Sequence, residues 1–331
     1  MRALICRNWG DIGTLELGEM PVPEPGPDQV LLDIVATSAN YADAIMVAGK
    51  YQTKPEFPFA PGLEGAGLVV KLGKGVENLK IGDRVMAKLA HGGFAEQAVA
   101  EASETWSLFD RMSFADGAAF AVAYLSAHVA LRWQGRLEAG ETLLVLGAAG
   151  GSGMAAVEIG KTMGARVIGA ASSEKKLQAV LQHGADHAVN YSSGNLKDQV
   201  LELTRGEGVD VCFDPVGGDL FDSALSSLGW GGRHIHYGFV GGVPRVPANR
   251  LLVKHRSAVG SSLRYFQNFR PDLLVQSMAE LAAAYDKGAF NPVISHRLPL
   301  ERGVEALRLL TERKAVGKVV VEVAPKKEIN Q

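Results

Sequence analysis

The chain has 331 residues, of which 47% are hydrophobic, and a formal net charge of −2 at pH 7. This length and composition predict a globular protein of about two domains, and the near-neutral charge gives no electrostatic reason to expect nucleic acid or an anionic membrane as a partner. The two cysteines, Cys6 and Cys212, each lie in an apolar run, which excludes a disulfide framework and a cysteine-rich zinc site.

The first part of the chain alternates short apolar runs with turns. Pro21–Pro27 and Gly92-Gly93 are turn clusters, and the runs include Val30–Val35 and Gly67–Val70. This pattern predicts a compact, mostly β domain. The chain opens with a strand-like run and shows no apolar stretch long enough to read as a membrane span, so we expect a cytoplasmic protein.

From about Ser113 the pattern changes to helical stretches that alternate with apolar strands. The strands are expected at Leu143–Leu146, Val167–Ala170, Val209–Phe213 and Arg233–Tyr237. Such alternation predicts a doubly wound parallel sheet with helices on both faces. After an amphipathic helix over 272–287, a strand over 318–323 is expected to rejoin the first domain, and the charged segment 326–328 is expected to fray.

A glycine-rich turn lies between the first of these strands and the next helix. Gly150, Gly151 and Gly153 are typical of a dinucleotide site, because backbone N–H groups and the positive end of a helix dipole must approach a pyrophosphate closely. Ala148 stands where the full fingerprint has its first glycine, which leaves an ordinary strand-to-helix turn as the alternative.

The end of the following strand distinguishes the two nicotinamide cofactors. An acid there would hydrogen-bond the ribose of NAD, whereas this strand ends in Ala171 and Ser172 and is followed by Lys175 and Lys176. A lysine ammonium ~4 Å from a 2′-phosphate contributes roughly 1 to 4 kcal/mol, so the sequence favours NADPH. Glu174 is expected to complement the helix dipole, and a solvated helix face is the alternative for the lysines.

Motifs along nearly the whole chain occur in the order of one family. The chain resembles the zinc-independent quinone oxidoreductases of the medium-chain dehydrogenase/reductase superfamily, the group that includes zeta-crystallin. The matching segments are Ser38–Asp43, Pro58–Gly67, Lys80–Val85, Gly93–Glu96, Gly147–Gly153, Gly184–His187, Val209–Gly217 and Lys314–Val319. The resemblance implies an α/β fold, with a GroES-like, mostly β catalytic domain at 1–122, completed by 265–331, and a Rossmann NADPH-binding domain at 123–264.

The resemblance also makes an absence informative. Zinc-dependent relatives carry a histidine where this chain has Leu63, so no catalytic zinc is expected and Glu64 is interpreted as a structural carboxylate. His234 and His236 lie on one face of a strand, but no third ligand is expected near them. His128 is interpreted as a packing or hydrogen-bonding residue.

The resemblance implies roles for individual residues. Asn40 and Tyr51 are the candidate catalytic groups, with Tyr51 or water as the proton donor. The residues implied to bind the cofactor are Asn40 and Ser126 at the nicotinamide, Ala149, Gly150, Gly151, Ser152 and Gly153 at the pyrophosphate, Ser172, Lys176 and Tyr191 at the 2′-phosphate and ribose, Gly238, Phe239 and Val240 at the carboxamide, and Lys314.

Three functions remain open from the sequence. The first is an NADPH:quinone oxidoreductase that acts without a metal. The second is a reductase of α,β-unsaturated carbonyls or enoyl thioesters, which would use the same site. The third is a non-catalytic NADPH-binding protein with a structural or RNA-binding role. By analogy with the family, we expect a homodimer joined through a strand at 259–263.

Overall fold

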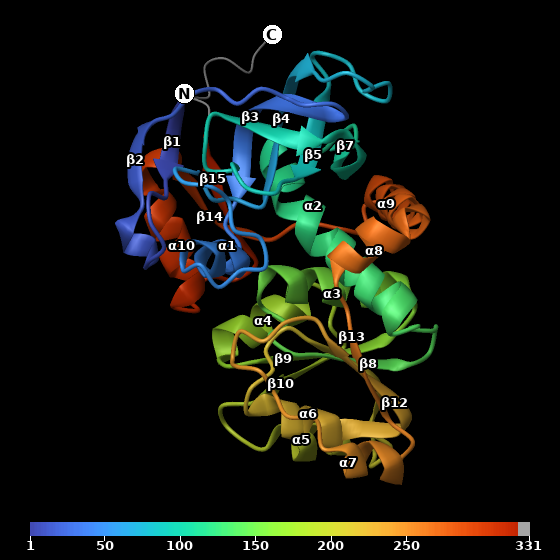
Figure 1. The fold of residues 1–331 in the computed structure, drawn as a ribbon. Coiled ribbons are helices and arrows are strands. Elements are labelled where there is room, and N and C mark those ends of the chain that lie inside the picture. The colour runs from blue at the N-terminus through green and yellow to red at the C-terminus, as the bar shows by residue number, and fades with distance from the viewer. Residues whose placement is uncertain (324–331) are drawn as a thin grey trace. The chain divides into compact units, whose positions relative to one another are not determined.

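The computed structural model describes residues 1–323, so the segment 326–328, for which a frayed end is expected, lies outside it. The chain divides into two compact units (Figure 1). The first comprises Met1–Val122 and Val293–Gln331, and the second comprises Ala123–Pro292.

The first unit is mostly β, as predicted. Its strands are β1 (Arg2–Ile5), β2 (Glu16–Glu19), β3 (Gln29–Ser38), β4 (Glu64–Leu72), β5 (Arg84–Lys88), β6 (Gln97–Glu101), β7 (Thr105–Ser107), β14 (Ile294–Pro299) and β15 (Lys318–Glu322). Its helices include α1 (Tyr41–Val47), α10 (Gly303–Thr311) and the short 3₁₀ turns η1 (Ile12–Thr14), η2 (Ala102–Glu104) and η4 (Leu300–Arg302). The main sheet has the order β14-β15-β3-β4-β5-β7, with β6 paired to β3.

Strand β3 lies at the centre of this sheet and pairs with β15, β4 and β6. Val30, Leu32 and Ile34 alternate along β3 and join a buried core with Val69 of β4 and Val85 of β5. Strands β15 and β4 both run antiparallel to β3. The start of β15, the end of β3 and the start of β4 therefore meet at one edge of the sheet, which is where the polar residues described below are found.

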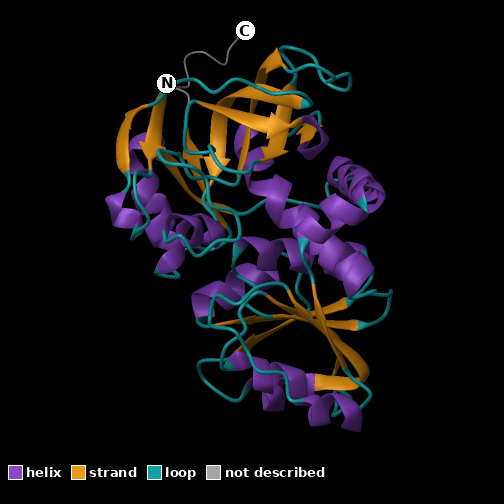
Figure 2. Ribbon diagram, in the orientation of Figure 1, coloured by secondary structure: helices purple, strands orange, loops and turns teal. Residues whose placement is uncertain are grey.

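The second unit is the doubly wound sheet that the sequence predicts (Figure 2). Its strands are β8 (Thr142–Val145), β9 (Arg166–Ala171), β10 (His187–Asn190), β11 (Val209–Asp214), β12 (Leu228–His236) and β13 (Ser257–Gly260), in the order β10-β9-β8-β11-β12-β13. Its helices are α3 (Gly151–Thr162), α4 (Glu174–Gln182), α5 (Leu196–Leu203), α6 (Leu220–Ser227), α7 (Ala248–Val253), α8 (Leu263–Phe269) and α9 (Pro271–Asp286).

All neighbouring strands of this sheet are parallel. Helices α3 and α4 cover one face, and α5 and α6 cover the other (Figure 1). The buried strand residues are apolar on both sides, as in Leu143, Leu144 and Val145, which have no exposed surface. The carboxyl ends of the strands therefore lie along a single edge, where ligands of such folds bind.

Helices α8 and α9 cluster with the second unit, so the division falls at Pro292 and Val293, whereas the sequence placed it at 264 and 265. Polar contacts show why α9 belongs there. The Trp133 indole N–H donates to Ser277 Oγ at 2.9 Å, and His128 Nε2 lies 3.2 Å from Glu280 Oε2. The amphipathic pattern over 272–287 predicts that one face of the helix is buried, but it does not indicate which unit buries that face.

Helix α2 (Phe114–Val129) begins in the first unit and is extended by a π-helical turn, η3 (Ala130–Gln134). The segment Phe114–Gln134 is long and apolar enough to cross a membrane by length and composition, although the sequence suggested no such stretch, and 89% of its apolar window is buried inside the protein. The buried core helix of a folded domain has the same length and apolar composition.

Candidate functional site

The residues predicted to bind the cofactor follow four strands of the second unit. Ala149 lies in the turn after β8, Ser172 follows β9, Tyr191 follows β10 and Gly238 follows β12. Because these strands are parallel, the structure brings all four positions to the same edge of the sheet. Two further contacts link neighbouring segments at this edge: Tyr191 N donates to Ala171 O at 3.2 Å, and the hydroxyls of Ser152 and Tyr237 lie 2.9 Å apart.

The glycine-rich turn begins helix α3 without a side-chain cap. Gly150 is the N-cap and makes no side-chain cap hydrogen bond, so the first N–H groups of the helix have no partner from a cap. A Cβ at Gly153 would lie 2.3 Å from Gly147 O and 2.7 Å from Ala148 Cα. Glycine is therefore required at position 153 for the helix to approach the strand, and the free N–H groups with the helix dipole suit a pyrophosphate.

The end of β9 carries the polar groups that would meet the 2′ position of the adenosine ribose. Ser172 is partly buried, Lys176 is partly buried and Lys175 is exposed. Ser173 is the N-cap of α4, and Glu174 accepts a hydrogen bond from Gln178 Nε2 at 2.7 Å. Glu174 thus lies in the first helical turn, where an acid complements the helix dipole, as predicted.

Two backbone hydrogen bonds hold the loops after β11 and β12 together. Gly218 N donates to Gly242 O at 2.8 Å, and Gly241 N donates to Val216 O at 2.7 Å. A Cβ at Gly218, whose φ is +56°, would lie 2.3 Å from Gly241 O. This close pairing leaves Phe239 59% exposed, at the edge where the sequence places it against the cofactor.

Four predicted site residues lie elsewhere. Ser126 is buried in α2 in the second unit. Asn40, Tyr51 and Lys314 belong to the first unit, where Tyr51 packs against the core. The Lys314 side chain is 66% exposed, with its Nζ 2.6 Å from Glu312 Oε2. The predicted residues are therefore divided between the two units, and only those at the edge of the parallel sheet follow neighbouring strands.

A buried cluster around Glu64 occupies the sheet edge in the first unit. Glu64 Oε1 accepts hydrogen bonds from Ser38 Oγ at 2.5 Å, Asn40 Nδ2 at 2.8 Å and Lys318 Nζ at 2.7 Å, and Oε2 accepts from Val122 N at 2.8 Å. Glu64 has no exposed surface, and the Lys318 side chain is 8% exposed. Protein groups thus satisfy the hydrogen-bonding capacity of this buried carboxylate, which agrees with the interpretation of Glu64 as a structural residue.

This cluster fixes the orientation of the Asn40 amide. Lys318 Nζ donates to Asn40 Oδ1 at 2.8 Å, while Asn40 Nδ2 donates to Glu64. An ammonium only donates and a carboxylate only accepts, so a flipped amide would lose both bonds. Asn40 therefore presents its side chain in one orientation, polarised by a buried positive charge.

Asp43 anchors the helix that begins at Asn40. Its Oδ2 accepts from Asn40 N at 2.7 Å, and its Oδ1 accepts from Leu63 N at 3.1 Å. Burial raises the pKa of Asp43 to about 7, with a further increase from the charge of Glu64, while the backbone donors and Lys318 oppose the shift. The same carboxyl group thus connects the backbone of Leu63 to the start of α1.

Lys318 and its contact with Asn40 were missed from the sequence. Lys318 begins a strand whose next residues, Val319, Val320 and Val321, are fully buried. Lysine is almost never buried unless it is paired, so a lysine beginning such a run was a usable signal. Its partners were not predictable, because Asn40 and Glu64 lie 278 and 254 positions away from it in the chain.

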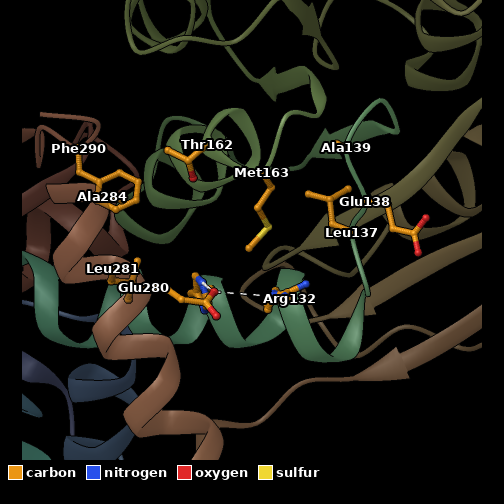
Figure 3. A pocket seen from close by; sticks show the side chains of 11 residues that line it. Arg132, Leu137, Glu138, Ala139, Thr162, Met163, Glu280, Leu281, Ala284 and Phe290 are labelled. Atoms are coloured by element: carbon orange, nitrogen blue, oxygen red, sulfur yellow. Dashed lines mark ion pairs between the residues drawn. The ribbon is translucent and has the colours of Figure 1, made fainter. Parts of the chain in front are cut away.

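The second unit contains a cavity of about 510 Å³ that none of the predicted site residues lines (Figure 3). Leu137, Met163 and Leu281 form apolar walls, and Arg132 and Glu280 lie at one side, joined by an ion pair of 3.7 Å. His128 also lines the cavity, and burial lowers its pKa to about 4, against the opposing effect of Glu280. A neutral, buried imidazole agrees with the predicted packing role of His128.

Helix α3 carries a second perturbed acid that the sequence did not indicate. Burial raises the pKa of Glu158 to about 7, although the Tyr124 hydroxyl donates to its Oε2 at 2.5 Å and Asn291 N donates to its Oε1 at 3.3 Å. Tyr124 is itself buried, with its ring 5.3 Å from that of Phe290. Tyr124 is therefore a core residue.

The expectation that no third ligand lies near His234 and His236 was wrong. Asp214 ends the adjacent strand, and its Oδ2 lies 2.9 Å from His234 Nε2. Strand pairing places Asp214 beside His236. This contact could not be inferred from the sequence, because it depends on the order of the strands in the sheet.

Two protein families match the chain. The family described as "Alcohol dehydrogenase GroES-like domain" matches residues 26–118, and the family described as "Zinc-binding dehydrogenase" matches residues 151–280. The first match lies in the mostly β unit and the second in the doubly wound unit. The predicted fold, a GroES-like domain with a Rossmann parallel sheet, is therefore confirmed.

Full-length relatives give a finer assignment. The chain is 38% identical over 324 residues to "Quinone oxidoreductase-like protein 2 homolog" of Nematostella vectensis, covering 97% of this chain and 88% of the relative. It is 34% identical over 308 residues to the quinone oxidoreductase of Rattus norvegicus, covering 92% of each chain. The Escherichia coli quinone oxidoreductase, solved in complex with NADPH, superposes with a TM-score of 0.91 at 26% identity, covering 97% of this chain and 100% of that one. The chain therefore belongs to the zinc-independent, quinone oxidoreductase-like family of medium-chain dehydrogenases/reductases, and is an oxidoreductase of that superfamily.

Proposed function

We propose that this protein is an NADPH-dependent reductase that transfers hydride to a quinone without a metal ion. The observation that carries the proposal is the saturated Glu64 cluster. Glu64 accepts four hydrogen bonds, and Leu63 stands where zinc-dependent relatives place a histidine. A catalytic zinc needs neutral imidazole or thiolate ligands with an open position, and this set does not supply them.

The preference for NADPH rests on the end of β9. The strand ends in Ala171 and Ser172, Lys176 is one turn into α4, and the acid Glu174 is engaged by Gln178. These groups fit a 2′-phosphate better than a bare ribose hydroxyl. The solved Escherichia coli relative that binds NADPH supports the same choice.

The glycine turn fits the pyrophosphate of the cofactor. Position 153 shows this fit, because a Cβ there would lie 2.3 Å from Gly147 O. With glycine at this position, the start of α3 stays close to the turn, as phosphate binding requires. The bound nicotinamide supplies a hydride. The contribution of this chain is to hold the phosphates at the start of α3 and the ribose near Ser172 and Lys176.

The first unit supplies the polar groups assigned to the acceptor. Lys318, whose charge is paired with Glu64, holds the Asn40 amide in one orientation, so that Asn40 offers a fixed polar group to the acceptor. The Tyr51 hydroxyl or water delivers the proton to the reduced product, as the sequence suggests. A quinone suits such a site because its reduction needs little Lewis-acid assistance.

We also propose a homodimer joined through β13. This strand is the outer strand of the six-stranded sheet, and within residues 1–323 only β12 pairs with it. Helix α7, which precedes β13, exposes Leu252 (83%) and Val253 (70%). An open strand edge beside exposed apolar residues suits pairing with the same strand of a second copy.

Acceptor assays on metal-stripped protein test the function. Consumption of NADPH is followed with phenanthrenequinone, benzoquinone, an enone, an enal and crotonyl-CoA, and each assay is repeated with NADH. Turnover of the quinones with NADPH is the expected result. Turnover of the activated alkenes alone would assign the protein to enoyl reduction, and turnover that depends on added zinc would contradict the proposal.

A further inference from the structure

Three side chains able to bind a metal lie together in the second unit. Asp214 is the last residue of β11, and His234 and His236 lie on the neighbouring strand β12. Residues two apart point to the same face of a strand, so both imidazoles face the same side. One donor atom from each of the three residues lies within 4.8 Å of the others. Phe221 of α6 covers the group, with ring centroids 4.9 Å from His234 and 5.2 Å from His236.

The cluster contains polar atoms that the protein does not satisfy. Asp214 and His234 are fully buried, and their contact of 2.9 Å is the only hydrogen bond that either imidazole makes among the described residues. Nδ1 of His234 and Nε2 of His236 are buried without a hydrogen-bond partner. An unsatisfied buried polar atom costs about 1–3 kcal/mol, and such atoms in a folded protein call for an explanation.

The carboxylate is already held in the way that metal ligands are held. Asp214 Oδ1 accepts hydrogen bonds from Val216 N and Gly217 N, both at 2.8 Å, which leaves Oδ2 directed to the imidazole of His234. Hydrogen bonds from the surrounding protein typically orient ligating carboxylates and preserve their charge. Asp214 thus combines a fixed orientation with an oxygen on the histidine side.

We propose that Asp214, His234 and His236 bind a divalent transition-metal ion, with zinc as the natural occupant. Two imidazoles and one carboxylate suit zinc and its neighbours, whereas magnesium and calcium prefer an all-oxygen set. Binding gives Nε2 of His236 the partner that it lacks. His236 is partly exposed, whereas Asp214 and His234 are fully buried, and the unpartnered ring nitrogens of both histidines are buried.

This site differs from the catalytic zinc of the zinc-dependent relatives. It uses none of the residues assigned to hydride transfer. Its three residues belong to the second unit, whereas Leu63 and Glu64 belong to the first. Its effect is structural, because it connects the end of β11 to the end of β12. The loops that follow these strands are joined by backbone hydrogen bonds of Gly218 and Gly241. These loops would be held more rigidly when the metal is bound.

Cobalt titration of untagged, chelator-treated full-length protein tests the site. We expect one equivalent of Co²⁺ to give a low-symmetry visible spectrum that Zn²⁺ abolishes. The variant His236→Phe keeps an aromatic ring against Phe221 but removes the donor, so its affinity for Co²⁺ should fall by more than ~10-fold. His296→Phe, which lies in the first unit, is the matched control and should bind as the unchanged protein does.

Thermal unfolding provides a second measurement that does not depend on a variant. One equivalent of Zn²⁺ should raise the Tm of the unchanged protein, because an ion that binds only the folded state stabilises it, and Mg²⁺ should not. Absence of stoichiometric Co²⁺ binding, or binding by His236→Phe equal to that of the unchanged protein, would overturn the proposal. An unchanged Tm with Zn²⁺ would do the same, even if the variant failed to fold. None of these measurements requires the enzyme to turn over a quinone.

Discussion

Lys318 Nζ lies 2.7 Å from Glu64 Oε1, and both side chains are almost completely removed from solvent. Lys318 also donates to the Asn40 amide oxygen, so one ammonium satisfies the buried carboxylate and orients the candidate catalytic amide. Stability and the geometry of the reaction site are therefore linked through a single residue.

Removing this ammonium should destabilise the protein. Lys318→Met leaves Glu64 as an unpaired buried charge, and we expect the free energy of unfolding to fall by ~3–5 kcal/mol, measured by urea denaturation. The double variant Lys318→Met with Glu64→Gln should recover part of the loss, because it removes the stranded charge. Lys318→Arg, which keeps the charge, is the control. A single variant as stable as the unchanged protein would show that the pair carries no such role.

The Glu64 cluster shows what the sequence could and could not predict. Asn40 was predicted as a site residue and Glu64 as a structural carboxylate because both lie in recognisable motifs near each other in the chain. Their shared partner comes from a strand near the other end of the described chain, and no local pattern records that pairing. The sequence thus supported assignments for residues within motifs, whereas contacts that depend on sheet topology were missed.

Substitution of Gly153 should weaken cofactor binding. In Gly153→Ala the new Cβ would lie 2.3 Å from Gly147 O, so the start of α3 must shift away from the turn. We expect a loss of ~1–3 kcal/mol in stability and a similar loss in binding, which corresponds to about 5- to 150-fold in the Kd for NADPH. Fluorescence titration measures the Kd. Gly10→Ala, whose Cβ would make only contacts of 3.4 Å or more, is the control.

Lys176 should determine the preference between the two nicotinamide cofactors. Lys176→Ala removes the charge proposed to meet the 2′-phosphate, so the Kd for NADPH should rise by at least ~5-fold while that for NADH stays nearly unchanged. The exposed neighbour Lys175 provides a matched control as Lys175→Ala. Equal losses for both cofactors would contradict the assignment, because NADH has no 2′-phosphate.

Glu158 should make the stability of the protein depend on pH. Its folded-state pKa of about 7 exceeds the ordinary value of 4.5, so between these two values the folded state keeps a proton that the unfolded state has released. Stability from this group is therefore lost as the pH rises from 4.5 to 7, by up to ~3 kcal/mol above pH 7.

The variant Glu158→Gln removes this titration. It should be more stable than the unchanged protein at pH 8, and the advantage should disappear near pH 4, as measured by chemical denaturation across the pH range. Glu207→Gln, at an exposed carboxylate of the same unit, should show no such crossing. A constant difference between Glu158→Gln and the unchanged protein at every pH would contradict the assigned cause.

The unit boundary illustrates a different limit of sequence reasoning. The periodicity over 272–287 correctly predicted helix α9 (Pro271–Asp286). Its partners are Trp133 and His128, which contact Ser277 and Glu280. An apolar stripe is compatible with burial in either unit, so only the observed contacts assign α9 to the second one.

The separation of Glu64 and Lys318 along the chain has a consequence for synthesis on the ribosome. The two residues are 254 positions apart, and the segment between them includes the entire second unit. Translation proceeds from the N-terminus, so the carboxylate emerges long before the ammonium that neutralises it. The second unit has all its strands available first and can fold while the first still waits for β15. The unit that begins to be made first is therefore the one completed last.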